Sequence, residues 1–104
     1  MNTITVQELK NMRDTGVEHQ LIDVREVYEV EEANIGGLSI PMGQVLAHLD
    51  EIRRDIPVVI HCRSGARSAA VISALEANAG YTNLHNLKGG ILAWITEIEP
   101  SLLD

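Results

Sequence analysis

The sequence predicts an α/β fold with a mainly parallel β-sheet, and three observations support this fold class. The chain has 104 residues, which is enough for one domain and too few for two. Its apolar residues form short runs that alternate with helical patterns, as in β-α-β units. Hydrophobic residues make up 45% of the chain and Phe is absent, so we expect a core of Leu, Ile, Val and Ala.

The first half of the chain begins with a helix signal and continues with short extended runs. Thr5-Val6-Gln7-Glu8 has the pattern of a capping box, and Gly16 ends the helical spacing that follows. Leu21-Ile22-Asp23-Val24 predicts a short strand, and a polar helix is expected from Glu26 to Glu32. Leu38-Ser39-Ile40 is the next extended run.

The second half contains the strongest strand signal. Pro57-Val58-Val59-Ile60-His61 is continuous and rich in β-branched residues, as expected for a strand that is buried on both faces. An Ala-rich helix follows and ends at Gly80, Leu84 to Leu87 predicts a last strand, and Gly89-Gly90 opens a final helix. Between the two halves, an amphipathic helix is predicted from the spacing of Val45, Leu46, Leu49 and Ile52.

The charge balance and the cysteine count narrow the function. Asp and Glu outnumber Lys and Arg by 15 to 8, which gives a net charge of −7 and a pI of about 4.9. Nucleic acids and anionic membranes bind to basic surfaces, so neither is expected as a partner. Cys62 is the only cysteine, which excludes an internal disulfide. Because no signal peptide or membrane segment is evident, a cytoplasmic location is expected.

Cys62 lies where the strongest predicted strand ends and a loop of small residues begins. The loop reads Arg63-Ser64-Gly65-Ala66-Arg67-Ser68, and a helix is expected to begin near Ala66. The N–H groups of such a loop, together with the positive end of the helix dipole, form an anion-binding nest. A thiol in this position is expected to have a lowered pKa and to exist largely as thiolate. The sequence therefore predicts that Cys62 is a nucleophile rather than a buried structural residue.

The residues next to Cys62 have different expected roles. Arg67 is expected to hold the loop and to neutralise an anion with its planar guanidinium. Ser68 either starts the helix or donates a hydrogen bond to the thiolate. His61 precedes Cys62 directly, and neighbouring side chains of a strand point to opposite faces. We therefore expect His61 to satisfy a backbone group near the site rather than to act as a base.

Three further residues are expected at or near the same edge of the sheet, where the parallel strands end. Asp23 and Arg25 follow an earlier strand, and we interpret them as a salt bridge that supports the loop. Lys88 either reaches toward an incoming anion or is a solvated loop residue. Four of the eight basic residues would then surround the thiol: Arg25, Arg63, Arg67 and Lys88. The remaining histidines have no metal-ligand spacing, so neither a metal nor another cofactor is predicted.

Three segments in the same order resemble the signatures of the rhodanese family of sulfurtransferases. Leu21 to Glu26 resembles the first signature, Val58 to Ser68 the active-site strand and loop, and Asn86 to Gly90 with Trp94 the C-terminal signature. The resemblance covers nearly the whole chain and implies a single rhodanese-like domain over residues 1–104. It also implies the three-layer fold of the family, with a mainly parallel five-stranded sheet and helices on both faces.

One segment departs from the family pattern. The family usually has Gly-His-Ile-x-Gly-Ala, whereas this chain has Ala33-Asn34-Ile35-Gly36-Gly37-Leu38. The missing histidine belongs to a structural turn, so the departure concerns the geometry of that turn more than the chemistry.

The resemblance implies a sulfurtransferase that works through a persulfide. The Cys62 thiolate would attack the outer sulfur of an anionic donor such as thiosulfate, release sulfite and carry the sulfur as Cys62–S–S⁻. The loop from Arg63 to Ser68 would bind the substrate and stabilise this anion, and a thiophilic acceptor would then remove the sulfur. Because the chain has no second cysteine, the acceptor is external: cyanide, a small thiol or the thiol of a partner protein.

Three alternatives to this function stay open from the sequence. A rhodanese-like sulfur-carrier or regulatory module would bind without thiosulfate turnover, although such modules generally lack the cysteine or the loop arginine. Cysteine-dependent phosphatases and arsenate reductases have one residue more between these two positions, which four residues separate here. A redox sensor would need an external thiol, because the chain has no resolving cysteine.

Overall fold

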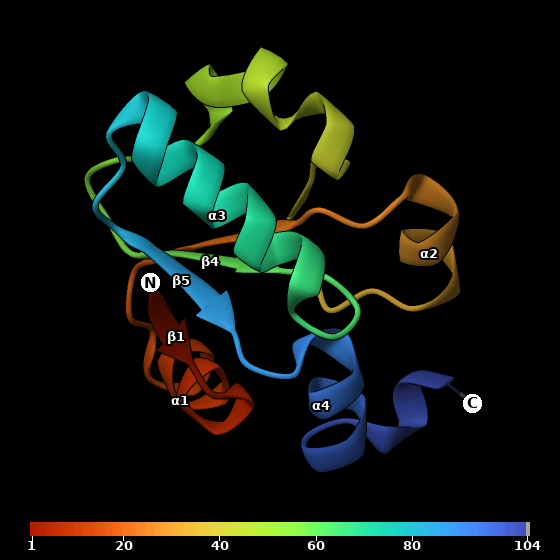
Figure 1. Cartoon of the computed structure of the whole chain (residues 1–104). Coiled ribbons are helices and arrows are strands. Elements are labelled where there is room, and N and C mark those ends of the chain that lie inside the picture. The colour runs from red at the N-terminus through yellow and green to blue at the C-terminus, as the bar shows by residue number, and fades with distance from the viewer. Residues whose placement is uncertain (104) are drawn as a thin grey trace.

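In the computed structural model, which describes residues 1–103, five strands form one parallel sheet (Figure 1). The strands follow the spatial order β1-β5-β4-β2-β3, so β4 lies at the centre. Helices cover both faces of this sheet, and the predicted α/β fold is therefore confirmed. The strands are β1 Asn2–Ile4, β2 Gln20–Asp23, β3 Leu38–Ser39, β4 Val58–His61 and β5 Leu84–Leu87.

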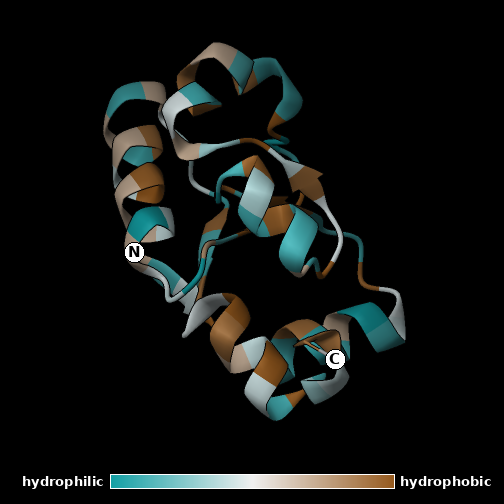
Figure 2. Cartoon of the chain, turned by 90° about the vertical axis from the view of Figure 1, so that its right-hand side faces the viewer, coloured by the Kyte–Doolittle hydropathy of each residue, from teal (hydrophilic) through white to brown (hydrophobic). Residues whose placement is uncertain are grey.

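The helices divide between the two faces of the sheet. Helix α3 and the 3₁₀ helix η1 cover one face, and α1 and α4 cover the other (Figure 1). Brown and teal segments alternate along the helices in Figure 2, as expected for helices with one buried and one exposed side. The helices are α1 Val6–Thr15, α2 Val27–Glu32, η1 Met42–Glu51, α3 Ala66–Ala79, α4 Gly90–Glu97 and η2 Pro100–Leu103.

Each face of the sheet carries its own hydrophobic core. The core under α3 includes Ile22, Val45, Ile52, Ile60, Cys62, Ile72 and Leu75. The core under α1 and α4 includes Val6, Leu9, Leu21, Val59, Leu87, Ile91 and Trp94. Successive residues of β2 and β4 thus contribute to opposite cores, as the two-residue period of a strand requires. No helix within residues 1–103 has the length and apolar character that crossing a membrane demands.

The signals that bound α1 are confirmed in detail. The Thr5 hydroxyl accepts a hydrogen bond from the Glu8 N–H at 3.1 Å, and the Glu8 carboxylate accepts one from the Thr5 N–H at 3.1 Å. Two of the N–H groups that a helix leaves unpaired at its start are therefore satisfied. At the other end, Gly16 adopts the left-handed conformation, with a φ of 73°.

The amphipathic helix predicted around residue 45 is present, but it is a 3₁₀ helix and not an α-helix. Residues 42–51 form 3₁₀ turns with a break at His48, whose φ and ψ are −126° and 29°. The break at His48 interrupts the regular spacing, so the apolar residues of this segment do not share one continuous helix face. Val45 is accordingly buried, whereas Leu46 is 64% exposed.

The turn that lacks the family histidine is held by other groups. The Asn34 side-chain oxygen accepts a hydrogen bond from the Gly36 N–H at 2.7 Å. Gly37 has a φ of 89°, and a Cβ atom on it would lie 2.5 Å from the Leu21 carbonyl oxygen. An Asx-type turn and a close approach of two backbones thus define the geometry of this turn.

Candidate active site

The end of β4, the following loop and the start of α3 together enclose the sulfur of Cys62. Cys62 follows His61 directly, and α3 begins at Ala66. Two backbone N–H groups point at the sulfur: that of Gly65 at 3.1 Å and that of Ser68 at 3.5 Å. Cys62 is only 1% exposed, so a reactant has to present a narrow atom to this sulfur.

The hydrogen bonds of the loop favour the ionised form of Cys62. Burial raises the pKa of the thiol, but the hydroxyl of Ser68 and the backbone N–H groups of Ser68, Gly65 and Ser64 together outweigh it, so the net pKa of Cys62 is lowered. The first turn of α3, whose N–H groups carry partial positive charge, lies beside the sulfur. The geometry therefore surrounds the sulfur with hydrogen-bond donors that favour a thiolate, and the nucleophilic role of Cys62 stays a prediction.

The hydroxyl of Ser68 has one hydrogen and three nearby acceptors. Its oxygen lies 3.4 Å from the Cys62 sulfur, 3.2 Å from the Gly65 carbonyl and 2.5 Å from the side-chain oxygen of Asn86. Ionisation makes the sulfur the only charged acceptor of the three, and hydrogen bonds to charged groups are the stronger ones. The contact with the sulfur is one of the two roles predicted for Ser68, and in this structure it competes with the shorter contact to Asn86.

Asn86 supports the loop from β5, a role that the sequence does not reveal. Its amide nitrogen donates to the Gly65 carbonyl at 3.1 Å while its oxygen contacts Ser68. A buried amide on a strand between apolar residues is the one local signal for such a role, because buried polar groups require partners.

Replacing Ser68 with alanine should raise the pH at which Cys62 ionises. The variant loses the hydroxyl that donates to the thiolate and keeps the backbone N–H. A hydrogen bond to a charged group contributes about 1.5–3 kcal/mol, so alkylation of Cys62 by iodoacetamide at pH 7 should slow by roughly tenfold. The pH profile of the alkylation rate measures this change.

Ser64→Ala is the matched control for this prediction. Ser64 lies in the same loop, but its side chain is exposed and contributes only a backbone group to the sulfur. Its alkylation profile should remain within the error of the wild-type profile. A Ser68→Ala profile that also coincides with the wild type would contradict the assigned contact.

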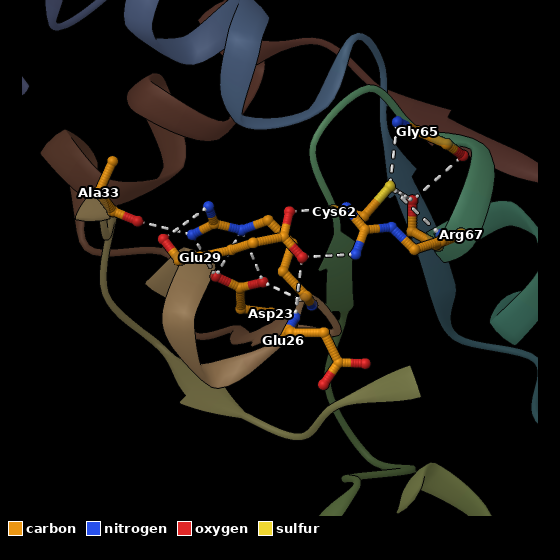
Figure 3. A network of polar contacts seen from close by, with 9 residues as sticks. Asp23, Glu26, Glu29, Ala33, Cys62, Gly65 and Arg67 are labelled. Atoms are coloured by element: carbon orange, nitrogen blue, oxygen red, sulfur yellow. Dashed lines mark hydrogen bonds and ion pairs between the residues drawn. The ribbon is translucent and has the colours of Figure 1, made fainter. Parts of the chain in front are cut away.

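Arg67 contacts an acidic residue of α2 that the sequence interpretation does not include. Its two terminal nitrogens donate to the two carboxylate oxygens of Glu29, at 2.7 and 2.9 Å (Figure 3). These hydrogen bonds lower the pKa of Glu29 to about 2, and the same contact raises the pKa of Arg67. The guanidinium that was expected to neutralise an anion is therefore already paired with a carboxylate.

Asp23 and Arg25 form a buried ion pair at the end of β2. The Asp23 carboxylate accepts hydrogen bonds from Nη2 of Arg25 at 2.8 Å and from its Nε at 3.1 Å (Figure 3). Arg25 also donates to the carbonyls of Glu29 at 3.2 Å and Ala33 at 2.6 Å. The pair thus holds the middle and the C-terminal end of α2, the helix that carries the partner of Arg67.

His61 is buried on the face of the sheet opposite the core that contains Cys62. Alternation along β4 places it with Val59, beside Asp23, whose Oδ2 lies 3.7 Å from Nε2 of His61. Burial lowers the pKa of His61 by more than the Asp23 carboxylate raises it. Neither ring nitrogen has a well-aligned hydrogen-bond partner within residues 1–103, but a contact with the backbone of Cys62 raises the pKa of His61. The expectation that His61 satisfies a backbone group near the site stays a prediction.

Arg63 and Lys88 are both exposed but lie in different places. Arg63 lines a cavity of about 290 Å³ between α2, the loop and α4, together with Tyr28, Glu29 and Leu92. Lys88 lines a separate cavity beside the start of α1 and the end of α4. The structure brings Arg63 and Arg67 to the loop, whereas Arg25 is turned into the Asp23 pair and Lys88 lies on another side.

Comparison with known proteins places this site in a family. The model of the Rhodanese-like domain family matches residues 5–97. The chain belongs to the rhodanese family. A solved structure of a rhodanese-related protein from Thermoplasma volcanium has a TM-score of 0.84 and 27% identity, with all of both chains covered. The rhodanese fold and the family predicted from the three segments are confirmed.

Rhodanese-family relatives with sulfurtransferase names match most of the chain. A protein from Allochromatium vinosum named sulfurtransferase is 41% identical over 71% of this chain and 69% of its own length. The probable adenylyltransferase/sulfurtransferase MoeZ of Mycobacterium tuberculosis is 34% identical over 98% of this chain. This chain spans only 26% of MoeZ, so it corresponds to one part of that larger protein. The chain thus belongs to a family that includes sulfurtransferases.

Proposed function

We propose that this chain is a thiosulfate-type sulfurtransferase that carries sulfane sulfur on Cys62. The observation that carries this proposal is the Cys62 sulfur, which accepts N–H hydrogen bonds from Gly65 at 3.1 Å and Ser68 at 3.5 Å at the start of α3. This arrangement favours a thiolate, the nucleophilic form of cysteine. The sulfurtransferase names of the relatives give the same reaction class.

The proposed cycle transfers one sulfur atom twice, first from the donor to Cys62 and then from Cys62 to the acceptor. The Cys62 thiolate attacks the outer sulfur of thiosulfate, the S–S bond of thiosulfate breaks, and sulfite leaves with the bonding electron pair. The product is Cys62–S–S⁻, whose charge the loop amides stabilise. A cyanide or thiolate acceptor then attacks the outer sulfur of the persulfide and regenerates the Cys62 thiolate.

The position of Arg67 favours sulfur transfer over phosphate chemistry. Four residues separate Cys62 from Arg67, and the guanidinium is engaged with Glu29. A cysteine-dependent phosphatase needs its loop arginine on the oxyanion that it cleaves. A single sulfur atom needs less space and fewer donors, which the N–H groups around Cys62 supply.

The acceptor in this cycle comes from outside the chain. Cys62 is the only cysteine, so the sulfur has no second thiol to move to. A reducing cytoplasm fits the cycle, because Cys62 has to return to the free thiolate after each transfer. Cyanide serves as the acceptor in an assay, and a small thiol or a thiol of a partner protein would serve in the cell.

Intact mass spectrometry after incubation with thiosulfate tests the proposal. We expect a gain of one sulfur atom, which added cyanide removes with release of thiocyanate. Hydrolysis of a phosphate ester without any sulfur uptake would favour the phosphatase alternative. An unchanged mass at every thiosulfate concentration, with Cys62 still free to react with iodoacetamide, would refute thiosulfate as the donor.

A further inference from the structure

The contact between Arg67 and Glu29 occupies a site suited to a donor anion. A guanidinium offers a planar pair of donors that fits the oxygens of a carboxylate, a phosphate or a sulfonate. In this structure both terminal nitrogens of Arg67 are used by Glu29, at 2.7 and 2.9 Å. The carboxylate lies on a side chain that is 15% exposed and borders the cavity beside the loop. Glu29 therefore competes directly with any sulfonate for this arginine.

The other basic residues near the loop do not replace Arg67 as a binding group for an anion. Arg25 is buried and paired with Asp23 at 2.8 Å, and Lys88 lines a different cavity. Arg63 remains as the exposed cation on the cavity, without an ion-pair partner within residues 1–103. A dianion such as thiosulfate would thus meet one available guanidinium and the N–H groups of the loop.

We propose that Glu29 is a specificity-determining residue that weakens the binding of sulfonate-bearing donors relative to organic persulfides. This proposal rests on the sulfurtransferase function of Cys62 and assigns the donor class that the site prefers. Glu29 would discriminate between donors by weakening the binding of one class, because its carboxylate both occupies Arg67 and repels a second anion.

Organic persulfides do not need the Arg67 guanidinium. The Cys62 thiolate attacks the outer sulfur of R–S–SH, the S–S bond breaks, and the thiolate R–S⁻ leaves with the electron pair. The proton remains on the transferred sulfur, which gives Cys62–S–SH, and its release to solvent then gives Cys62–S–S⁻. This leaving group has no sulfonate oxygens, so the N–H groups of the loop supply the stabilisation that the reacting sulfur requires.

The test compares the two donor classes in Glu29→Gln and in Glu32→Gln. Glu32 lines the same cavity, but it is exposed and makes no hydrogen bond or ion pair to Arg67. Both variants remove one negative charge. With Glu29→Gln, the KM for thiosulfate should fall by roughly tenfold, as expected for one charge-assisted contact, while kcat/KM for an alkyl persulfide without a carboxylate or sulfonate group stays within about twofold. Glu32→Gln should change neither the KM for thiosulfate nor the kcat/KM for the persulfide by more than about twofold.

A binding measurement separates this effect from general loss of structure or activity. In the Cys62→Ser background, calorimetry with sulfite should show tighter binding for Glu29→Gln than for the parent. If Glu29→Gln does not fold, Glu29→Asp, which keeps the charge but shortens the side chain, should move the thiosulfate KM in the same direction. Equal thiosulfate kinetics for the Glu29 and Glu32 variants would overturn the assignment. Failure of the wild type to accept sulfur from either donor would instead refute the sulfurtransferase function.

Discussion

Replacing Cys62 with serine should abolish sulfur loading. A serine hydroxyl fits the same loop, but it does not ionise near neutral pH and cannot form a persulfide. Because Cys62 is the only cysteine, no other thiol in the chain can take up the sulfur. Intact mass spectrometry after thiosulfate treatment should show no added sulfur, and thiocyanate production from cyanide should fall to the uncatalysed rate.

The serine variant should lose chemistry without losing the fold. The loop N–H groups of Gly65 and Ser68 keep an oxygen acceptor in place of sulfur, and the change removes little volume from the core. Thermal unfolding should therefore occur within a few degrees of the wild-type midpoint, as expected for a change of about 1 kcal/mol. Persistent sulfur uptake by a folded Cys62→Ser variant would contradict the assignment of the nucleophile.

The positions of the strands along the chain and the position of the thiol could be predicted because their signals are local. The apolar run Val58–Ile60 predicts a strand that is buried on both faces, and the small-residue loop after Cys62 predicts the nest. The helix at residues 42–51 could not be predicted in type. Apolar residues at 45, 46, 49 and 52 fit an α-helix, and only packing against α3 and β2 selects 3₁₀ turns with Leu46 exposed.

The electrostatics of the site depend on contacts that sequence spacing does not contain. Glu29 and Arg67 are 38 residues apart, and Ser68 and Asn86 are 18 residues apart. Counting four cations near Cys62 overestimates the positive charge, because Asp23 neutralises Arg25 and Glu29 neutralises Arg67. The Asp23–Arg25 pair is local and could be predicted from its two-residue spacing, whereas the Glu29–Arg67 pair forms only because the fold places α2 beside the start of α3.

Replacing Gly90 with alanine should disrupt the site and destabilise the fold. Gly90 opens α4 with a φ of 59°, and a Cβ atom there would lie 2.4 Å from the Arg63 carbonyl oxygen and 2.6 Å from that of Cys62. Both contacts are with backbone, which cannot rotate away as a side chain can. Backbone strain and overpacking together should lower the free energy of unfolding by about 2–5 kcal/mol, measured by urea denaturation.

Gly43→Ala is the matched control for stability. Gly43 lies in η1 and has no heavy atom within 4 Å of the position of a Cβ atom. The free energy of unfolding of this variant should stay within about 1 kcal/mol of the wild-type value. A Gly90→Ala variant as stable as Gly43→Ala would show that α4 can move away from the loop without cost.

Gly90→Ala should also slow sulfur loading by the molecules that remain folded. The first turn of α4 fixes the loop through two backbone hydrogen bonds. The N–H of Ile91 donates to the Cys62 carbonyl at 3.0 Å, and the N–H of Leu92 donates to the Arg63 carbonyl at 3.1 Å. Pushing α4 away releases these carbonyls, so the N–H groups of the loop lose their fixed direction toward the sulfur. Both measurements are made without urea, where the variant is folded. The pH profile of Cys62 alkylation should shift to higher pH, and the rate of sulfur loading should fall by roughly tenfold or more. Normal loading by the folded variant would mean that the loop keeps its own conformation, and that the contact with α4 contributes only to stability.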